Sequence, residues 1–218
     1  MEVRVLGGNH SIIDQYISEI RCESIQKDPL RFRENLQRLG ELFAYEISKE
    51  MKYTVKKVKT PLGIADVPVL IEQPVLASIL RAGLLLHQGL LHIFDRAENC
   101  FISAFRKYDD HGGFSIESEY FASPSLHEKT IILSDPMLAT GASLEIAYRA
   151  LLEKGTPSHV HIVSLIASRQ GLNYLKEKIT DENVNLWLGA IDEEMTYKSY
   201  IVPGLGDAGD LAYGPKLD

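Results

Sequence analysis

Residues 130–143 read Thr130-Ile131-Ile132-Leu133-Ser134-Asp135-Pro136-Met137-Leu138-Ala139-Thr140-Gly141-Ala142-Ser143. The apolar run at the start predicts a buried strand, and the small and hydroxylated residues after it predict a short loop that leads into a helix. At such a junction backbone N–H groups converge, and the helix dipole adds partial positive charge. Because the hydroxyls of Thr140 and Ser143 add donors, the segment predicts an anion site suited to a phosphate.

Two residues of this loop have specific consequences for the site. Gly141 lets the backbone approach a phosphate where a Cβ would collide. Asp135 would repel a phosphate, so its carboxylate should face another group, and a ribose diol can donate two hydrogen bonds to it. An Asx turn or a helix cap is the alternative role for Asp135. No Gly-Lys-Ser/Thr sequence follows, which argues against a nucleoside-triphosphate P-loop.

The order strand, loop, helix continues on both sides of this segment. Strands are predicted at 75–80, 100–105, 160–167 and 184–191, and helices at 83–93, 142–154 and 171–178. Apolar strands that alternate with helices indicate an α/β fold, a parallel sheet flanked by helices on both faces. Ligands bind beyond the carboxyl ends of such strands, so we expect the chemistry to follow Leu80, Phe105, Ser134 and Ile191.

The N-terminal region has a different pattern. Ser11 precedes helical spacing at 12–20, and Asp28-Pro29 begins a second helix whose apolar stripe extends to Ile47. Residues 52–72 favour β structure and turn near 61–63, so they predict a protruding β-arm. An isolated hairpin is marginal in water, so the arm should pack on a partner in a homodimer or higher homo-oligomer. With no linker between these regions, we expect residues 1–218 to form a single domain.

The composition excludes several classes of protein. Lys and Arg number 23 against 30 Asp and Glu, a net charge of −7, which argues against a nucleic-acid partner. A hydrophobic content of 45% excludes an intrinsically disordered chain. Two cysteines do not make a disulfide framework. We find no secretory leader and no apolar run of about 18 residues, so we expect a cytoplasmic protein without a membrane partner.

Three more segments carry candidate site residues. The loop at 199–214 contains three glycines and two acids between Pro203 and Asp210, and its bare backbone donors and acceptors suit the edge of a planar pyrimidine. Arg81 follows a strand, where a planar guanidinium suits phosphoryl oxygens, although a surface contact is the common alternative. Arg106 opens a charged segment that ends in Gly-Gly, and an ordinary exposed hairpin remains an equal alternative there.

The loop after Ser134 resembles the phosphoribosyl-pyrophosphate (PRPP) motif of the type I phosphoribosyltransferases. Its sequence, Asp-Pro-Met-Leu-Ala-Thr-Gly, is similar in particular to that of the uracil phosphoribosyltransferase branch, with Ala142 where that branch usually has a second Gly. The resemblance implies a type I phosphoribosyltransferase fold and transfer of the phosphoribosyl group of PRPP to uracil, giving UMP and pyrophosphate. It implies that PRPP is bound by Arg81, Arg106, Asp135, Pro136, Met137, Leu138, Ala139, Thr140, Gly141, Ala142, Ser143 and Asp207.

The C-terminal loop resembles the uracil-binding loop of the same branch. This implies that Ile201, Gly206, Asp207 and Ala208 face the base. It also implies that Mg²⁺ is the cofactor, held through PRPP and water, with Asp207 as a further contact. Asp135, Arg81 and Asp207 are the expected catalytic residues. Some relatives are activated by GTP, so the resemblance includes GTP as a candidate activator.

Two other functions stay open on the sequence. A UMP-responsive RNA-binding regulator on the same fold would need a basic face, for which Lys56-Lys57-Val58-Lys59 is the longest basic run. A phosphoribosyltransferase for another base, such as hypoxanthine, is disfavoured by the loop after Pro203. His159 and His161 would share one face of a strand without a cluster of acids or cysteines, so we predict solvated or structural histidines there.

Overall fold

The computed structural model describes residues 1–108 and 114–216, without the side chains of residues 104–119. The described residues form a central sheet in the order β1-β10-β9-β7-β4-β5-β6, with the short β8 paired to β9. All of these pairs are parallel except β5 with β6. The strands are β1 (Glu2–Val5), β4 (Val75–Leu80), β5 (Glu98–Tyr108), β6 (Phe114–Ala122), β7 (Thr130–Ser134), β8 (Met137–Leu138), β9 (His159–Ser168) and β10 (Val184–Asp192).

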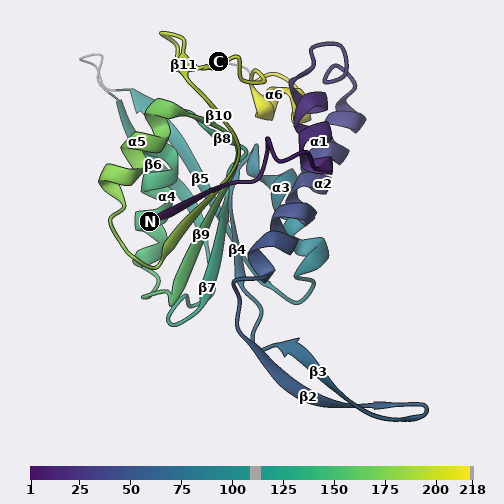
Figure 1. Ribbon diagram of the computed structural model, residues 1–218. Coiled ribbons are helices and arrows are strands. Elements are labelled where there is room, and N and C mark those ends of the chain that lie inside the picture. The colour runs from purple at the N-terminus through teal and green to yellow at the C-terminus, as the bar shows by residue number, and fades with distance from the viewer. Residues whose placement is uncertain (109–113, 217–218) are drawn as a thin grey trace.

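Helices cover both faces of this sheet (Figure 1). The first face is covered by α1 (Ile12–Arg21), α2 (Pro29–Ser48), α3 (Gly83–Ile93) and the short α6 (Ala208–Tyr213). The second face is covered by α4 (Ala142–Leu152) and α5 (Arg169–Lys178). The predicted parallel sheet flanked by helices is confirmed, with the antiparallel edge strand β6 as an addition. Within residues 1–108 and 114–216, no helix has the length and apolar character needed to cross a bilayer.

The two N-terminal helices begin where the sequence predicts. The Ser11 hydroxyl accepts from the Ile13 N–H at 3.3 Å, and the Asp14 carboxylate accepts from the Ser11 N–H at 3.0 Å. Asp28 caps α2, where Pro29 occupies the first turn and has no N–H to satisfy. These caps fix where α1 and α2 begin. The last residue of α1, Arg21, contacts the C-terminal segment through the Gly204 carbonyl.

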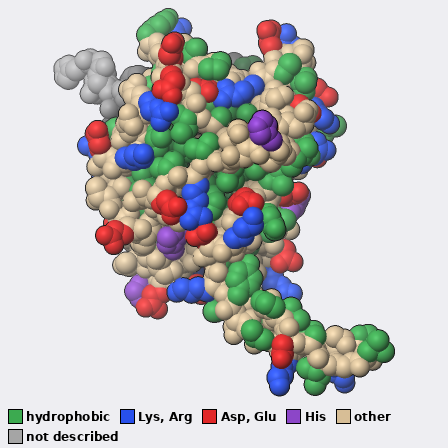
Figure 2. All heavy atoms as spheres, in the orientation of Figure 1, with side chains coloured by type: hydrophobic (Ala, Val, Ile, Leu, Met, Phe, Trp, Pro, Cys, Tyr) green, Lys and Arg blue, Asp and Glu red, His purple; other side chains and the backbone are tan. Residues whose placement is uncertain are grey.

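A two-stranded arm projects from the sheet (Figure 1). It consists of β2 (Tyr53–Thr60) and β3 (Gly63–Leu70), which pair antiparallel as a separate sheet, so the predicted hairpin is confirmed. Figure 2 shows hydrophobic side chains along the arm. Val55 is 67% exposed and Ile64 74% exposed, values far above those of core residues.

The structure corrects the sequence prediction in three places. The edge strand β1 was not predicted, because it has only four half-buried or exposed residues beside β10. The antiparallel edge strand β6 was also not predicted. The segment 199–214, predicted as a loop throughout, contains β12 (Ile201–Val202), paired with β11 (Glu194–Met195), and the helix α6. That helix buries Ala208 and Ala212 in the core on the α2 side, a contact that local sequence does not reveal.

Candidate active site

Three cavities at the carboxyl edge of the sheet are all lined by Asp135. The first, about 160 Å³, is also lined by Arg81, Ser143 and Asp207. The second, about 190 Å³, extends from Asp135 to the C-terminal segment at 199–209. The third, about 60 Å³, is lined by Asp135 and by loop residues up to Leu144. The structure therefore brings the predicted phosphate loop, the C-terminal segment and Arg81 into one cleft.

Backbone contacts with β9 hold the loop after β7 to the sheet. The Pro136 carbonyl accepts from the N–H groups of Leu165 and Ile166, both at 3.0 Å, and Met137 pairs with Ile166 as part of β8. Pro136 is buried and lines none of the three cavities, although the sequence placed it among the PRPP contacts. Its position indicates that it anchors the loop. Ala142, the first residue of α4, also lies outside the three cavity linings.

Gly141 is required for reasons that differ from the predicted one. Its φ is +86°, a left-handed conformation that side chains rarely adopt. A Cβ there would lie 2.9 Å from Tyr174 Cδ1 and 3.0 Å from the Gly171 carbonyl oxygen, both on α5. From the sequence alone, the expected collision was with a bound phosphate. The structure shows that the protein's own packing already excludes a side chain at this position.

Two residues that the sequence argument did not single out fix the phosphate loop from the side. The Ser168 hydroxyl donates to the Ala139 carbonyl at 2.5 Å and accepts from the Gly171 N–H at 2.8 Å. A Cβ on Gly171 would lie 2.2 Å from the same Ala139 oxygen. The available signal was a serine three residues before the helix predicted at 171–178, which is typical of an ordinary helix cap. The observed helix begins earlier, at Arg169, directly after Ser168.

The Asp135 carboxylate has an unusual environment. Burial raises its pKa to about 7, and one backbone hydrogen bond, from the Met137 N–H at 3.3 Å, acts in the opposite direction. That bond is the Asx turn that the sequence left as an alternative role. Asp135 also lines all three cavities, so the residue makes this turn and borders the cleft at the same time.

The C-terminal segment presents backbone to the second cavity. Ile201 and Ala208 are buried, whereas Gly206 is exposed with a φ of +93°. Asp207 caps α6, because its Oδ1 accepts from the Asp210 N–H at 2.9 Å. Its other carboxylate oxygen lies 4.0 Å from Lys216 Nζ. The four residues predicted to face the base therefore all line one cavity together with Asp135.

Arg81 follows β4 and joins the two halves of the cleft. The peptide bond between Leu80 and Arg81 is cis. The guanidinium donates from Nη2 to Asp210 Oδ1 at 3.2 Å, a partner that the sequence argument did not name. Because both side chains are more than a third exposed, this ion pair is weak and can exchange for an anionic ligand. Arg106 belongs to β5, but its side chain is not among those that the structure describes. Asp109 and Asp110 lie outside the described residues.

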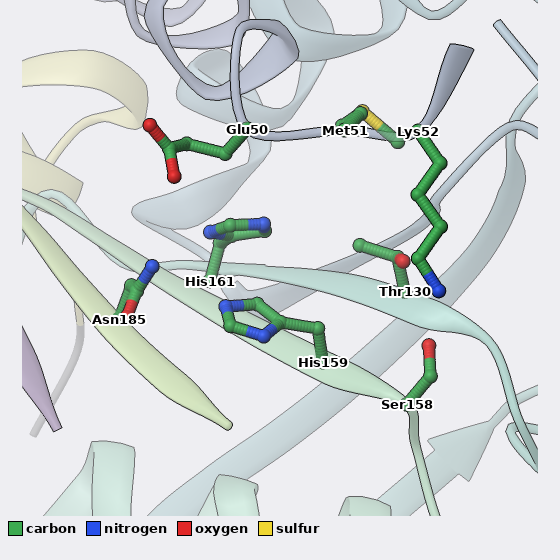
Figure 3. A pocket seen from close by; sticks show the side chains of 8 residues that line it. All are labelled: Glu50, Met51, Lys52, Thr130, Ser158, His159, His161 and Asn185. Carbon is green, nitrogen blue, oxygen red and sulfur yellow. The ribbon is translucent and has the colours of Figure 1, made fainter. Parts of the chain in front are cut away.

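A further cavity of about 280 Å³ lies at the opposite edge of the sheet, beside the amino ends of β7, β9 and β10 (Figure 3). His159 and His161 both line it. Trp187 Nε1 donates to His161 Nδ1 at 3.1 Å, and burial lowers the pKa of His161 to about 3. His161 is therefore neutral and bonded within the protein, in agreement with the structural role predicted for it. The described part of the chain has no group of three potential metal ligands.

Comparisons with known proteins point to one family. Residues 7–215 match the sequence model of the family described as uracil phosphoribosyltransferase. The chain is 54% identical over 217 residues to a uracil phosphoribosyltransferase of Porphyromonas gingivalis (strain ATCC 33277), with 100% of both chains covered. It is 35% identical over 220 residues to that of Methanothermobacter thermautotrophicus, covering 100% of this chain and 98% of the relative. The solved structure of the AQ2163 protein from Aquifex aeolicus has a TM-score of 0.84 at 32% identity, covering 97% of this chain and 98% of that one.

Proposed function

The chain belongs to the uracil phosphoribosyltransferase family and is a transferase, and from that premise we propose that the cleft around Asp135 is where it joins uracil to PRPP, giving UMP and pyrophosphate. One observation carries the assignment of the site. Asp135 lines the cavity of the phosphate loop, the cavity of the C-terminal segment and the cavity that contains Arg81. A reaction that joins a base to a ribose carrying a 5′-phosphate and a pyrophosphate needs these three surfaces around one sugar.

The phosphate loop and Asp135 would hold the sugar phosphate. The 5′-phosphate would accept from the backbone N–H groups of residues 139–143 at the start of α4, where the helix dipole favours an anion. The ionised Asp135 would accept from the ribose hydroxyls. As pyrophosphate leaves, positive charge develops at the ribose C1, and a fixed carboxylate nearby stabilises it. Catalysis then rests on positioning and electrostatics, without a covalent nucleophile.

Arg81 and Mg²⁺ would stabilise the leaving pyrophosphate. Asp207 lines the same cavity as Arg81 and offers the oxygen donors that magnesium prefers. Magnesium usually keeps several waters and binds through one or two carboxylates plus substrate phosphates, which fits a site without a group of three protein ligands in its described residues. We therefore expect Asp207 to hold the ion through water. When bound, the ion neutralises charge on the pyrophosphate.

Uracil would be read by backbone at Ile201 and at residues 206–208. The exposed backbone of Gly206 offers donors and acceptors without a covering side chain. Cytosine carries an amine where uracil carries a carbonyl, so a donor aimed at that position would be left unpaired. The segment therefore supports a preference for uracil over cytosine.

A pyrophosphate-release assay with PRPP and MgCl₂ tests the function, with uracil, cytosine, hypoxanthine and guanine added in turn. We expect release with uracil alone. Release with a purine but not with uracil would overturn the base assignment.

Addition of GTP to the same assay tests whether GTP activates the enzyme. Salt-dependent retention on an RNA column, with no pyrophosphate release, would instead support an RNA-binding regulator. Cytoplasmic localisation stays a prediction, which fractionation of the source cells tests.

Asp207→Asn tests the magnesium contact. The asparagine oxygen can still accept from the Asp210 N–H and cap α6, so folding should be preserved. We expect the Mg²⁺ concentration for half-maximal rate to rise about tenfold or more, the usual cost of losing an outer-sphere ligand. A melting temperature equal to that of the wild type serves as the folding control. An unchanged Mg²⁺ dependence would contradict the role of Asp207.

The arm supports a homodimer or higher oligomer. Its strands pair with each other and with no other strand of the described chain, and its apolar side chains lie open to solvent (Figure 2). Burial of a Val or Ile side chain contributes about 1.5–3 kcal/mol, and a partner subunit would supply that burial for several residues at once. We therefore propose that the arm packs on a second copy of the chain.

Val55→Asp tests this packing. In the proposed interface it would place a charge in an apolar contact, so we expect the oligomer to dissociate at micromolar concentration in sedimentation velocity. Leu30→Asp is the matched control, because Leu30 is a similarly exposed apolar residue (61%) on α2, outside the arm. The proposal fails if the wild type is monomeric, or if both variants sediment as the wild type does.

A further inference from the structure

The C-terminal segment that lines the second cavity is joined to the end of β10 by a hydrogen-bonded closure. The chain leaves β10 at Asp192, forms the short β11–β12 hairpin, and returns at Gly204. The Gly204 N–H donates to Asp192 Oδ2 at 2.9 Å across this twelve-residue span. Gly204 itself has a φ of +57°, and a Cβ there would lie 2.2 Å from the Ile201 carbonyl oxygen. The backbone conformation at Gly204, where the chain comes back to the end of β10, therefore requires glycine.

Arg21, the last residue of α1, completes the closure. Its Nη1 and Nη2 donate to Asp192 Oδ2 and Oδ1, both at 2.8 Å, and Nη1 also donates to the Gly204 carbonyl at 2.9 Å. The Asp192 side chain is only 7% exposed. Burial alone would raise the pKa of Asp192, but its hydrogen bonds from Arg21 and from the Gly204 N–H hold that pKa below its usual value. Both groups are therefore charged and mutually satisfied at neutral pH.

The position of this closure relates it directly to the cleft. Asp192 is in register with Ser168 on the adjacent strand β9. Ser168 holds the phosphate loop through the Ala139 carbonyl, whereas Asp192 holds the C-terminal segment through Gly204. The last residues of two neighbouring strands therefore anchor the two halves of the cleft. Ile201 precedes Gly204 by three residues and Gly206 follows it by two, so both lie close in sequence to the anchor.

We propose that Arg21 and Asp192 are positioning residues for the base: they fix Gly204 and thereby the backbone at Ile201 and residues 206–208 that reads the pyrimidine edge. Neither side chain lines the second cavity, so neither touches the base itself. This inference rests on the proposed function. It also gives α1 a role in base recognition, through its last residue, that its sequence does not indicate.

Asp192→Asn and Arg21→Gln test this role, with Glu193→Gln as the matched control. Glu193 is the neighbouring carboxylate and also pairs with an arginine, Arg169, but on the exposed surface. We expect the KM for uracil to rise about tenfold to 100-fold in both test variants, because a displacement of about 1 Å in a positioned group has effects of that size. The KM for PRPP should change less than about twofold. The double variant should be no worse than the single ones, since either change breaks the same closure.

A second measurement follows the segment without substrate. Amide hydrogen exchange at residues 201–208 should be faster in Asp192→Asn than in the wild type, with exchange in α4 unchanged. An equal rise in both KM values, an unchanged KM for uracil, or unchanged exchange at 201–208 would overturn the positioning role. If the wild type uses another base, the proposed uracil activity fails, and the exchange measurement and the KM for that base still decide the closure.

Discussion

Asp135→Asn is expected to lower kcat/KM for PRPP about 100-fold or more while making the unliganded protein more stable above neutral pH. The loss of activity follows from the charge. A hydrogen bond to a charged group contributes about 1.5–3 kcal/mol, and the proposed contacts at the ribose need the ionised carboxylate, which asparagine cannot supply. Since burial raises the pKa of Asp135 to about 7, kcat/KM of the wild type should rise with pH through about 7. The variant should lack that step.

Asp135→Asn should stabilise the protein, although it lowers activity, because the folded state disfavours the ionised form of the Asp135 carboxyl group. The carboxyl titrates near 3.8 in the unfolded chain and near 7 in the folded one, so the folded state binds more protons between these values. Its contribution to stability is therefore fully present below pH 3.8 and is lost as the pH rises to about 7. Asparagine removes this loss. We expect Tm at pH 8 to exceed that of the wild type by about 2–4 °C or more, which corresponds to roughly 1 kcal/mol in a chain of this size.

Asp181→Asn is the control for both measurements. Asp181 is exposed and lies outside the cleft linings. Its carboxylate accepts a hydrogen bond at 2.9 Å from the hydroxyl of Tyr148, a residue of α4. It should change neither the pH profile nor kcat/KM. A turnover of Asp135→Asn within threefold of the wild type would rule out the ribose role. A melting temperature that does not rise at pH 8 would rule out the unfavourable ionisation.

Gly171→Ala is expected to raise the KM for PRPP about tenfold or more. The new Cβ would lie 2.2 Å from the Ala139 carbonyl oxygen and 3.1 Å from that of Leu138, so the phosphate loop must move outward. Overpacking of this kind costs about 1–3 kcal/mol. Because the loop residues from Met137 to Gly141 line the third cavity, their displacement should weaken binding of the sugar phosphate, as measured by calorimetry with PRPP.

Gly63→Ala is the matched control, because a Cβ at Gly63 meets nothing within 4 Å. Its KM for PRPP should equal that of the wild type. Ser168→Ala gives a milder test of the same contact, since it removes the hydrogen bond to the Ala139 carbonyl without adding volume. Normal KM values in both Gly171→Ala and Ser168→Ala would show that this packing does not set the geometry of the loop.

The local elements of the fold were predictable because their signals are local. β4, β7 and α3 have the predicted bounds, since an apolar run that ends at a polar or small residue marks both ends of a buried element. β5 and β9 extend beyond the predicted strands by one to three residues at each end. β1 and β6 were missed because edge strands need neither apolar continuity nor alternation when a neighbouring strand supplies the hydrogen bonds.

The candidate site likewise contains residues that local sequence signals reveal and residues that only the folded chain brings together. Asp135, Arg81 and the loop at 139–143 were found because each directly follows a predicted strand or begins a predicted helix, and the carboxyl ends of parallel strands must share one edge. Asp192 also follows this rule, as it comes directly after Ile191. Its partner Arg21 lies 171 positions away. No spacing in the sequence could connect these two residues, because the pair forms only when α1 packs over the end of β10.

The amino-acid sequence by itself determined the parallel sheet and the projecting arm, because hydrophobic period, caps and turn residues act over a few neighbouring positions. It also predicted loops whose chemistry suits a phosphate and a pyrimidine. Only the tertiary structure decided how these parts hold one another. The raised pKa of Asp135 depends on burial by the surrounding fold, and the need for glycine at 141 and 171 depends on the contact of α5 with the phosphate loop. The closure of Asp192 on Gly204 by Arg21 depends on three segments that meet only in the folded chain.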